Sequence, residues 1–445
     1  MKKVFFVILA VLLAVMIFFL FEINKDILSK KSQEKENEIT NEQIQEEIPV
    51  DKRSVTYNGW LHTKGTKLVN EHDEIVQLRG MSSHGIEWYG NIVTKENLAE
   101  LKELWNTNIF RIAMYTDTND GNGYCFHQEY DKQLAYQMID MCIDLDMYVI
   151  IDWHILTDNN PQIHQDSAMT FFNEVSQKYA EVPNVLYEIC NEPNGATNWD
   201  NNIKPYAEAV IPVIRNNSPK SVILVGTPNW SQLVNKAADN PLSFENICYT
   251  LHFYSGTHKQ ELRDVAQYAI NKGVPVFVSE CGMTTADGNG ELYEEEFKTW
   301  VSFMDKNDIS YCYWSLSNKN EGSATLIPSY TPTIKVESDN TNTNQTSNNV
   351  VANATANITN TNTNTNNTVQ NTTSNDDYAK KLQGMLNPKT NATNTTNTTV
   401  SITNDINDGL TIEGTENTKE LPQSMENFLS ASGRAIKTIF NSYIN

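Results

Sequence analysis

The segment VLYEICNEPNG, residues 185–195, begins as a short apolar run and changes abruptly into polar and turn-forming residues. Its first half is typical of a buried strand. Glu192 stands where that strand is expected to end, between Asn191 and Pro193. A carboxylate at the end of a buried strand has to be solvated, paired or used in chemistry. The rest of the sequence decides between these three possibilities.

Seven further apolar runs resemble this one, and longer amphipathic segments separate most of them. In chain order the eight runs are IVQLRGM (75–81), NIFRIAMY (108–115), MYVIIDWH (147–154), NVLYEICNE (184–192), SVILVGT (221–227), ICYTLHFY (247–254), VPVFVSE (274–280) and ISYCYWSL (309–316). The helix-like segments between them are Lys95–Trp105, Asp131–Leu145, Ser167–Tyr179, Lys204–Arg215, Lys259–Lys272 and Tyr293–Lys306, with a weaker signal over Ser231–Ala238.

This alternation predicts the fold class. Continuous apolar strands that alternate with helices indicate a parallel sheet covered on both faces. Eight such repeats, spaced by roughly thirty residues, predict an α/β protein with a (β/α)8 TIM barrel. A doubly wound open sheet is the alternative. The absence of a glycine-rich phosphate loop after the first run argues against it.

Charge and cysteine content restrict the partners and cofactors. The 445 residues carry a formal net charge of −22, so the phosphates of a nucleic acid would be repelled. The six cysteines include no C-x-x-C pair, which argues against a zinc or redox motif. We expect most of them to be small buried thiols, and their spacing alone assigns no disulfide.

The carboxyl ends of the eight runs are unusually polar and aromatic. In a (β/α)8 barrel these ends meet on the face that carries function. Each residue alone could be structural, but their repeated placement at the same end indicates one shared site. The residues are His84, Arg111, Tyr115, Trp153, His154, Asn191, Glu192, Trp230, His252, Tyr254, Glu280 and Trp314.

Two of these residues, Glu192 and Glu280, are carboxylates that end the fourth and seventh runs. Since alternate strand residues share a face, we expect Val276, Val278 and Glu280 to point the same way. Two carboxylates that flank a bound chain suit glycosidic cleavage, where one must be protonated and the other ionised. A metal site would use the same residue type, but no His-x-x-x-His or clustered Asp motif accompanies them.

The neighbouring residues offer the means to separate the two pKa values. Arg111 can approach Glu280 and hold it as a carboxylate, and Tyr254 and Asn191 can donate hydrogen bonds nearby. Aromatic residues also favour a sugar substrate, because pyranose rings stack on flat aromatic faces. Such residues at or near strand ends are Trp88, Tyr89, Trp153, Trp230 and Trp314.

Seven motifs in order carry a resemblance to a known family. VLYEICNEPNG, VFVSECGMTTADG, LRGMSSHGIEWYG, IFRIAMY, VIIDWHIL, TLHFY and YWSLSNKNEGSA together resemble the cellulases of glycoside hydrolase family 5, of the bacterial endoglucanase type. The resemblance covers about residues 55–330, and LSASGRAIK (429–437) is similar to the closing helix of the family. It implies a (β/α)8 barrel, a retaining mechanism, and no cofactor or metal.

The resemblance also implies a role for each matching residue. Glu192 would be the acid/base and Glu280 the nucleophile, with Asn191 on the sugar 2-hydroxyl. Arg111 and Tyr254 would orient the nucleophile, and His154 and His252 would line the cleft and support the two glutamates. The positions that would contact the glucan are His84, Tyr115, Trp230, Trp314, Lys319 and Glu321.

The implied substrate is a β-1,4-glucan that is cleaved internally. No obvious carbohydrate-binding module follows the barrel motifs, so soluble or amorphous glucan is expected rather than crystalline cellulose. Two alternatives stay open. One is a hemicellulase of the same fold that acts on mannan, xyloglucan or mixed-linkage glucan. The other is a glycan-binding protein without catalysis, which the presence of both glutamates disfavours.

Composition divides the chain into five segments. We expect a signal peptide or membrane anchor over residues 1–21, a polar linker over 22–54, the catalytic barrel over 55–337, a disordered Asn/Thr-rich insertion over 338–404 and a C-terminal segment over 405–445. Lys2 and Lys3 precede an apolar run over residues 4–21, which is about the minimum for a membrane-spanning helix. We therefore expect an extracellular monomer, secreted or anchored to the outer face of the membrane.

The C-terminal segment contains a second helical signal. MENFLSASGRAIKTIFNSYI (425–444) spaces its apolar residues mostly by three or four, which indicates an amphipathic helix. No helix follows the eighth run directly, so we expect this segment to supply the eighth barrel helix after a long insertion. A tail helix that packs against nothing is the alternative.

Overall fold

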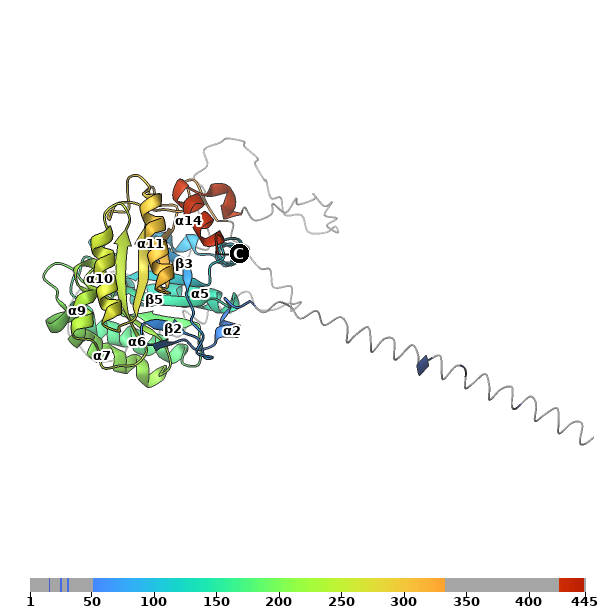
Figure 1. Ribbon diagram of the computed structural model, residues 1–445, viewed down its shortest axis with the longest axis horizontal. Coiled ribbons are helices and arrows are strands. Elements are labelled where there is room, and N and C mark those ends of the chain that lie inside the picture. Colours follow the sequence, from blue (N-terminus) through green and yellow to red (C-terminus); the bar gives the residue numbers. More distant parts are fainter. Residues whose placement is uncertain (1–15, 17–24, 26–29, 32–50, 333–423, 444–445) are drawn as a thin grey trace, which may run out of the picture. The chain divides into compact units, whose positions relative to one another are not determined.

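The computed structural model describes residues 51–332 and 424–443, together with the isolated positions 16, 25, 30 and 31 (Figure 1). The chain divides into two compact units, Met1–Arg53 and Ser54–Asn445, and the second contains the fold described below. The apolar run over residues 4–21, apart from Met16, and the Asn/Thr-rich tract over 338–404 lie outside the described residues. Within the described part of the chain, no helix combines the length and apolar character needed to span a membrane.

Eight parallel strands close into a barrel, as the alternation of runs and helices predicts. Around the barrel the order is β10-β3-β4-β5-β6-β7-β8-β9, so each strand neighbours the next in sequence and the last pairs with the first. The strands are β3 (Arg79–Ser83), β4 (Ile109–Tyr115), β5 (Tyr148–His154), β6 (Val185–Glu188), β7 (Ile223–Val225), β8 (Ile247–Tyr254), β9 (Val276–Gly282) and β10 (Tyr311–Leu316).

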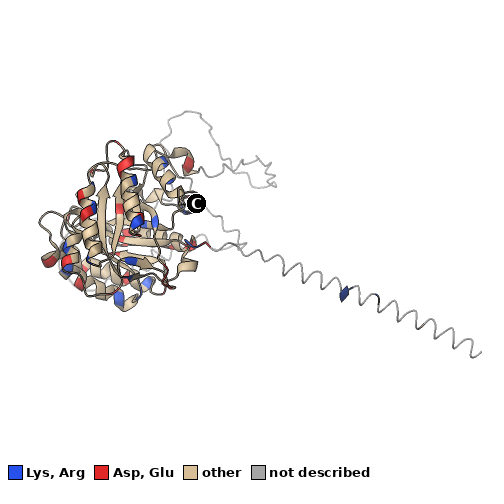
Figure 2. Cartoon of the chain, in the orientation of Figure 1, with Lys and Arg blue, Asp and Glu red and all other residues tan. Residues whose placement is uncertain are grey.

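Helices surround the barrel, and acidic and basic residues are interspersed over them (Figure 2). The larger ones are α4 (Lys95–Leu104), α5 (Tyr124–Asp144), α6 (Gln165–Lys178), α7 (Lys204–Asn217), α10 (Gln260–Asn271), α11 (Glu294–Lys306) and α14 (Ala431–Asn441). Shorter helices are α2 (Val55–Asn58), α3 (Ile86–Tyr89), α8 (Pro228–Ser231) and α9 (Val234–Asp239). Single helical turns span Gly90–Ile92, Pro161–His164, Trp199–Ile203 and Met425–Phe428.

Two helix predictions need correction at their N-terminal ends. The helix predicted over Asp131–Leu145 begins at Tyr124, because an additional turn precedes His127, whose φ of −133° interrupts the helix. The apolar periodicity does not extend through this turn. The weaker signal over Ser231–Ala238 corresponds to α9, which starts at Val234 after a left-handed turn.

The barrel strands alternate between two apolar layers. In β4, Ile109 and Ala113 face the interior, whereas Phe110 and Ile112 pack against the surrounding helices. This alternation turns Arg111 inward as well, and its side chain is completely buried. Arg111 therefore lies in the middle of β4, deeper in the barrel than the end of the second run at which we expected it.

An antiparallel hairpin, β1 (His62–Lys64) and β2 (Lys67–Val69), contributes Leu61 and Leu68 to the apolar cluster inside the barrel. The first apolar run was predicted as a strand over residues 75–81, which is only partly right. Its first half pairs with this hairpin, since Val76 N donates to Leu68 O at 2.9 Å. The barrel strand β3 then begins at Arg79.

Helix α14 packs on β10, although the Asn/Thr-rich tract separates them in sequence. The hydroxyls of Tyr313 in β10 and Ser432 in α14 lie 2.6 Å apart. The ring of Phe440 stacks on Tyr311, with centroids 5.9 Å apart. Ser430 caps the helix by accepting a hydrogen bond from Gly433 N. These contacts place α14 where the eighth helix of the barrel belongs.

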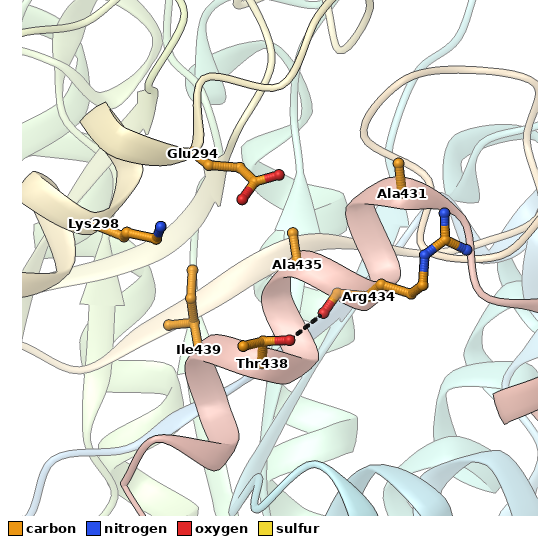
Figure 3. Close-up of a pocket in the computed structure, with 7 residues that line it drawn as sticks. All are labelled: Glu294, Lys298, Ala431, Arg434, Ala435, Thr438 and Ile439. Carbon is orange, nitrogen blue, oxygen red and sulfur yellow. Dashed lines mark hydrogen bonds between the residues drawn. The ribbon is translucent and has the colours of Figure 1, made fainter.

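A hollow of about 400 Å³ opens between α11 and α14. Figure 3 shows Ala435 and Ile439 of α14 facing Glu294 and Lys298 of α11, whereas Arg434 points away from α11. Arg434 instead donates to Leu429 O at 2.6 Å. The lining contains none of the residues expected at the site, so this hollow belongs to the packing of two neighbouring helices.

Candidate active site

Glu280 in β9 is held from two sides. The hydroxyl of Tyr254 donates to its Oε1 at 2.7 Å, and Nη1 of Arg111 donates to its Oε2 at 3.0 Å. Tyr254 comes from β8 and Arg111 from β4, so residues from opposite parts of the barrel meet at this carboxylate. The two donors fix the orientation of Glu280 and stabilise its charged form.

The inward direction of Glu280 depends on a β-bulge and not on strand alternation. We expected Val276, Val278 and Glu280 to share one face, which is wrong. Val276 and Val278 pack in the layer between strands and helices, whereas Glu280 faces the barrel interior. The register between β8 and β9 shifts after Phe277, where His252 pairs with Glu280. This extra residue turns two successive side chains, Ser279 and Glu280, inward.

Glu192 lies beyond the end of β6, which ends at Glu188 and not, as we expected, next to Glu192. Its Oε1 is 2.9 Å from Nδ1 of His252. Nε2 of the same imidazole is 3.0 Å from Oγ of Ser279. Ser279 in turn donates to Oε1 of Glu188 at 2.5 Å. A buried chain of polar groups therefore leads from Glu188 to Glu192.

The environments of the two glutamates shift their pKa values in opposite directions. Burial raises the pKa of Glu192, although its hydrogen bond with His252 partly offsets this. Burial alone would also raise the pKa of Glu280, but the charges of His252 and Arg111 lower it below its ordinary value. Glu192 is thus suited to hold a proton and Glu280 to remain ionised at the same pH.

His252 carries a positive charge near neutral pH. Burial disfavours the charged ring, but the carboxylates of Glu188 and Glu192 raise the pKa of His252 to about 9. Its Nδ1–H then donates to Oε1 of Glu192, so the proton of the Glu192 carboxyl is carried by Oε2. The imidazolium therefore orients the acid.

Arg111 connects the two halves of the site. Besides Glu280, its guanidinium donates to Glu188 at 2.7 Å and to Oδ1 of Asn191 at 2.6 Å, and it lies 3.0 Å from Asp152. Despite burial, the Arg111 charge helps lower the pKa of Glu188 to about 2. A planar group with five N–H donors suits such a cluster, which a lysine could not serve in the same way.

A second histidine fixes Asn191. Nδ1 of His154 is 2.6 Å from Asp152, and its Nε2 is 3.2 Å from Nδ2 of Asn191. Burial and the Arg111 charge lower the pKa of His154 to about 3, so the ring is neutral. A neutral ring that donates to Asp152 through Nδ1 has to accept from Asn191 through Nε2. This arrangement sets the direction of the Asn191 amide.

Aromatic and charged side chains form the wall of the cleft on the His84 side. The ring of His84 lies 4.9 Å from Trp314, and the ring of Tyr115 lies 4.1 Å from His154. Lys319 bonds Glu321 at 2.6 Å and lies 3.1 Å from Nε2 of His84. The structure therefore brings together the residues expected to contact the substrate here, which are His84, Tyr115, Trp314, Lys319 and Glu321.

Trp230 lines a second part of the site together with Glu192. It is 42% exposed and lines, with Glu192, His252 and Tyr254, a cavity of about 330 Å³. It belongs to a run of three non-glycine residues with positive φ, Asn229, Trp230 and Ser231. Left-handed backbone of this kind costs of order 1–3 kcal/mol per residue and is concentrated at functional sites.

Trp153 does not belong to the cleft, although it was grouped with the sugar-stacking aromatics. It is completely buried, and its ring packs 5.1 Å from Tyr124 and 5.7 Å from Phe171. Because it precedes the inward-facing His154 by one residue, it faces the helices.

Sequence reasoning missed three buried members of the site, Asp152, Glu188 and Ser279. A signal for the first two was present, since each is a single acid within an otherwise apolar strand. Asp152 is also two residues before His154 and therefore shares its face. Ser279 had no such signal, because only the bulge turns it inward.

Glu192, His252 and Glu280 each place one oxygen or ring nitrogen within 4.8 Å of the other two. Three such groups could hold a metal ion. Here, however, Arg111 and Tyr254 already bind both oxygens of Glu280. His252 lies between Glu192 and Ser279, and its raised pKa opposes the loss of the proton that metal binding requires. The donor set therefore suits proton transfer better than a cation.

The distance between the Glu192 and Glu280 carboxyl groups also distinguishes between the two mechanisms of glycoside hydrolysis. Retaining glycosidases place their two carboxyl groups about 5–5.5 Å apart, whereas inverting enzymes need about 6.5–9.5 Å to admit a water molecule. One carboxyl oxygen of Glu192 lies within 4.8 Å of one of Glu280, which fits the retaining arrangement. The pair can therefore deliver a proton and a nucleophile to one bond.

Comparisons with known proteins agree with this geometry. The family model described as cellulase (glycosyl hydrolase family 5) matches residues 69–320. An endoglucanase from Clostridium saccharobutylicum is 48% identical over 273 residues, covering 61% of this chain and 60% of that protein. Endoglucanase A from Evansella cellulosilytica is 48% identical over 259 residues, covering 58% of this chain and 52% of that protein. The chain thus spans between half and two thirds of the length of these two curated relatives.

Two solved structures show the same similarity. A cellulase structure with 48% sequence identity matches with a TM-score of 0.60 and covers 61% of this chain and 85% of that one. The catalytic domain of a Thermobifida fusca endoglucanase, solved in complex with cellotetraose, is 38% identical. It matches with a TM-score of 0.59 and covers 62% of this chain and 90% of that one.

Proposed function

Because the chain belongs to glycosyl hydrolase family 5, we propose that it is a retaining endo-β-1,4-glucanase that cleaves internal bonds of cellulose or related β-glucans. The observation that carries this proposal is the carboxyl pair Glu192 and Glu280, whose oxygens approach within 4.8 Å. The pKa of Glu192 is raised and that of Glu280 is lowered. This is the division of roles that a double displacement requires.

In the first step, a carboxylate oxygen of Glu280 attacks the anomeric carbon. The bond from that carbon to the glycosidic oxygen breaks, and Glu192 gives its proton to the leaving oxygen. The products are a glycosyl ester on Glu280 and a shortened glucan chain. Arg111 and Tyr254 keep Glu280 ionised and directed at the carbon through the hydrogen bonds described above.

In the second step, Glu192 acts as the base. Its carboxylate takes a proton from a water molecule, whose oxygen forms a bond to the anomeric carbon, and the ester to Glu280 breaks. Glu192 is protonated again and Glu280 is again a carboxylate. His252, which bonds Glu192 at 2.9 Å, stabilises the charged form that Glu192 takes between the two steps.

The proposed substrate is soluble or amorphous β-1,4-glucan. The names of the curated relatives as endoglucanases and the cellotetraose bound to the Thermobifida fusca domain support it. Trp314, which stacks on His154, and Trp230, which lines a cavity with Glu192, supply aromatic faces at the site. We also propose that the protein is exported and is a monomer. Residues 4–21 would form the apolar part of a signal peptide or a membrane anchor.

The rate at which the viscosity of carboxymethylcellulose falls tests the proposed activity. We expect rapid thinning by the wild type and a loss of several orders of magnitude in both Glu280→Ala and the isosteric Glu280→Gln. Glu208→Gln is the matched control, because Glu208 is exposed on α7.

Two results would contradict the proposal. If the wild type left the polymer unchanged but hydrolysed mannan or xyloglucan, the substrate would be wrong. A folded Glu280 variant with full activity would contradict the mechanism on any substrate.

A further inference from the structure

The backbone that follows β7 takes a conformation that L-amino acids rarely adopt. Asn229, Trp230 and Ser231 have φ values of 59°, 55° and 53°, and none of them is glycine. Thr227 N donates to Ser231 Oγ at 3.1 Å, and Ser231 N donates back to Thr227 O at 3.0 Å. This pair of bonds closes the left-handed turn and turns the Ser231 side chain inward, where it is completely buried.

Two hydrogen bonds join this turn to the residues on either side of Glu192. Ser231 Oγ donates to Asn191 O at 2.6 Å, and Trp230 N donates to Pro193 O at 3.0 Å. The turn therefore holds the carbonyl before Glu192 and the carbonyl after it. A strained backbone that makes two bonds around a single carboxyl residue indicates that the position of this residue matters.

Besides this turn, the end of β5 and the loop that follows it hold the main chain around Glu192, since Asn191 N donates to Trp153 O at 3.2 Å. Strand β6 ends at Glu188, so the sheet ladder does not reach the acid. Glu192 N donates to Ile155 O at 3.3 Å, and Glu192 O accepts from Nδ2 of Asn194 at 2.9 Å.

The two segments also touch through their backbones. A Cβ added at Gly226 would overlap Cys190 O and lie 2.9 Å from Asn191 O. The turn after β7 is therefore a close backbone support of the Glu192 segment, in addition to β5 and the loop that follows it.

We infer that Ser231 is a positioning residue for the general acid, and that its hydroxyl holds the Asn191–Glu192 main chain at the depth from which Glu192 reaches the leaving oxygen. This inference rests on the proposed function, since it assumes that Glu192 protonates a leaving group. Ser231 is not expected to touch the substrate. Its effect should appear only where proton delivery limits the rate.

Aryl β-cellobiosides separate this role from a structural one. 2,4-Dinitrophenol leaves without protonation, whereas unsubstituted phenol needs a proton from the acid. The measured quantity is kcat/KM, which reports the glycosylation step, across a series of such phenols. In Ser231→Ala we expect kcat/KM for the phenyl substrate to fall at least about tenfold, and that for the dinitrophenyl substrate to stay near the wild-type value.

Three further variants separate the hydroxyl from the backbone strain. Ser231→Gly loses the hydroxyl but tolerates positive φ, so it should fold at least as well as Ser231→Ala and show the same dependence on the leaving group. Asn229→Gly relieves strain but keeps the hydroxyl, so its leaving-group dependence should equal that of the wild type. Ser432→Ala removes a buried hydroxyl that bonds the Tyr313 hydroxyl and Ser323 O instead of the segment around Glu192, so it should lower the melting temperature without changing the leaving-group dependence.

The possible failures are distinguishable. If Ser231→Ala and Ser231→Gly show the wild-type dependence on the leaving group, Ser231 only closes the turn and the inference is overturned. If every phenol is affected equally, the loss is general and the inference is again overturned. A wild type that hydrolyses neither aryl cellobiosides nor glucan would instead overturn the proposed function on which the inference rests.

Discussion

At the scale of single residues, one cation organises the site. Arg111 bonds Glu280, Glu188 and Asn191 and lies 3.0 Å from Asp152. Removing a guanidinium and several carboxylates from water is costly. The buried cluster is stable only because the attraction between the opposite charges and their hydrogen bonds offset this cost. The sequence predicted Glu280 as a partner of Arg111, and the structure confirms this contact. Its other carboxylate partners, Asp152 and Glu188, became identifiable only with the barrel register.

A prediction about pH dependence belongs to this scale. His252 lowers the pKa of both Glu192 and Glu280 through its charge, so replacing it by glutamine should raise both pKa values. Under the proposed mechanism, activity is lost at low pH when Glu280 is protonated and at high pH when Glu192 loses its proton. Both limbs of the profile of kcat/KM against pH should therefore move to higher pH in His252→Gln.

The control for this experiment is His164→Gln, since His164 pairs with Asp117 at 3.0 Å and contacts neither glutamate in the part of the chain described here. Its profile should match the wild type. Limbs that stay in place in His252→Gln, or move in opposite directions, would contradict the electrostatic role assigned to His252.

At the scale of elements, the predictions succeeded where burial alone determines the pattern. Strands buried on both faces are continuous apolar runs, which is why the eight barrel strands could be located from the sequence. The convergence of polar strand ends then follows from parallel topology, and it places His154, His252 and Glu280 on one face.

The elements that were mispredicted depend on local backbone geometry. The bulge in β9 turns both Ser279 and Glu280 inward, and the left-handed turn after β7 positions Trp230. Neither leaves a trace in hydrophobic periodicity, because periodicity reports which face of an element is buried and not where the backbone departs from regular geometry. The interruption of the first apolar run before β3, which begins at Arg79, was missed for the same reason.

Helix α14 provides the prediction at this scale. Phe440 is completely buried and stacks on Tyr311, so Phe440→Ala should lower the free energy of unfolding by about 3–5 kcal/mol. Thr438→Ala on the exposed side of the same helix should stay within about 0.5 kcal/mol of the wild type. Urea unfolding followed by circular dichroism measures both. Equal stability of the two variants would show that α14 does not contribute to the barrel core.

At the scale of the whole molecule, the second compact unit, Ser54–Asn445, contains every residue assigned to the site. The predicted segments over residues 1–21, 22–54 and 338–404 lie largely or wholly outside the described residues, so their roles remain predictions from composition. Composition locates the segments over 22–54 and 338–404 because they have too little apolar content to build a core, and it locates the first segment by its continuous apolar run.

The proposed export can be tested by comparing the full chain with a chain that starts at residue 51 in a bacterial host. We expect activity of the full chain in the medium or the membrane fraction, and activity of the shortened chain in the cytoplasm. Both should have the same melting temperature, because residues 1–50 precede the second compact unit, Ser54–Asn445, which contains the barrel. N-terminal sequencing of the exported form distinguishes a cleaved signal from an anchor. Cytoplasmic activity of the full chain would contradict export.

The distance in sequence between β10 and α14 has a consequence for the order of folding. β10 ends at Leu316, whereas α14, which covers it, begins at Ala431. The ribosome must therefore synthesise the whole intervening tract before the last groove around the barrel can be filled. Until then Tyr311 and Tyr313 lack the packing of Phe440 and the hydroxyl of Ser432. Completion of the barrel therefore comes at the end of synthesis, an order that would suit the proposed export of an incompletely folded chain.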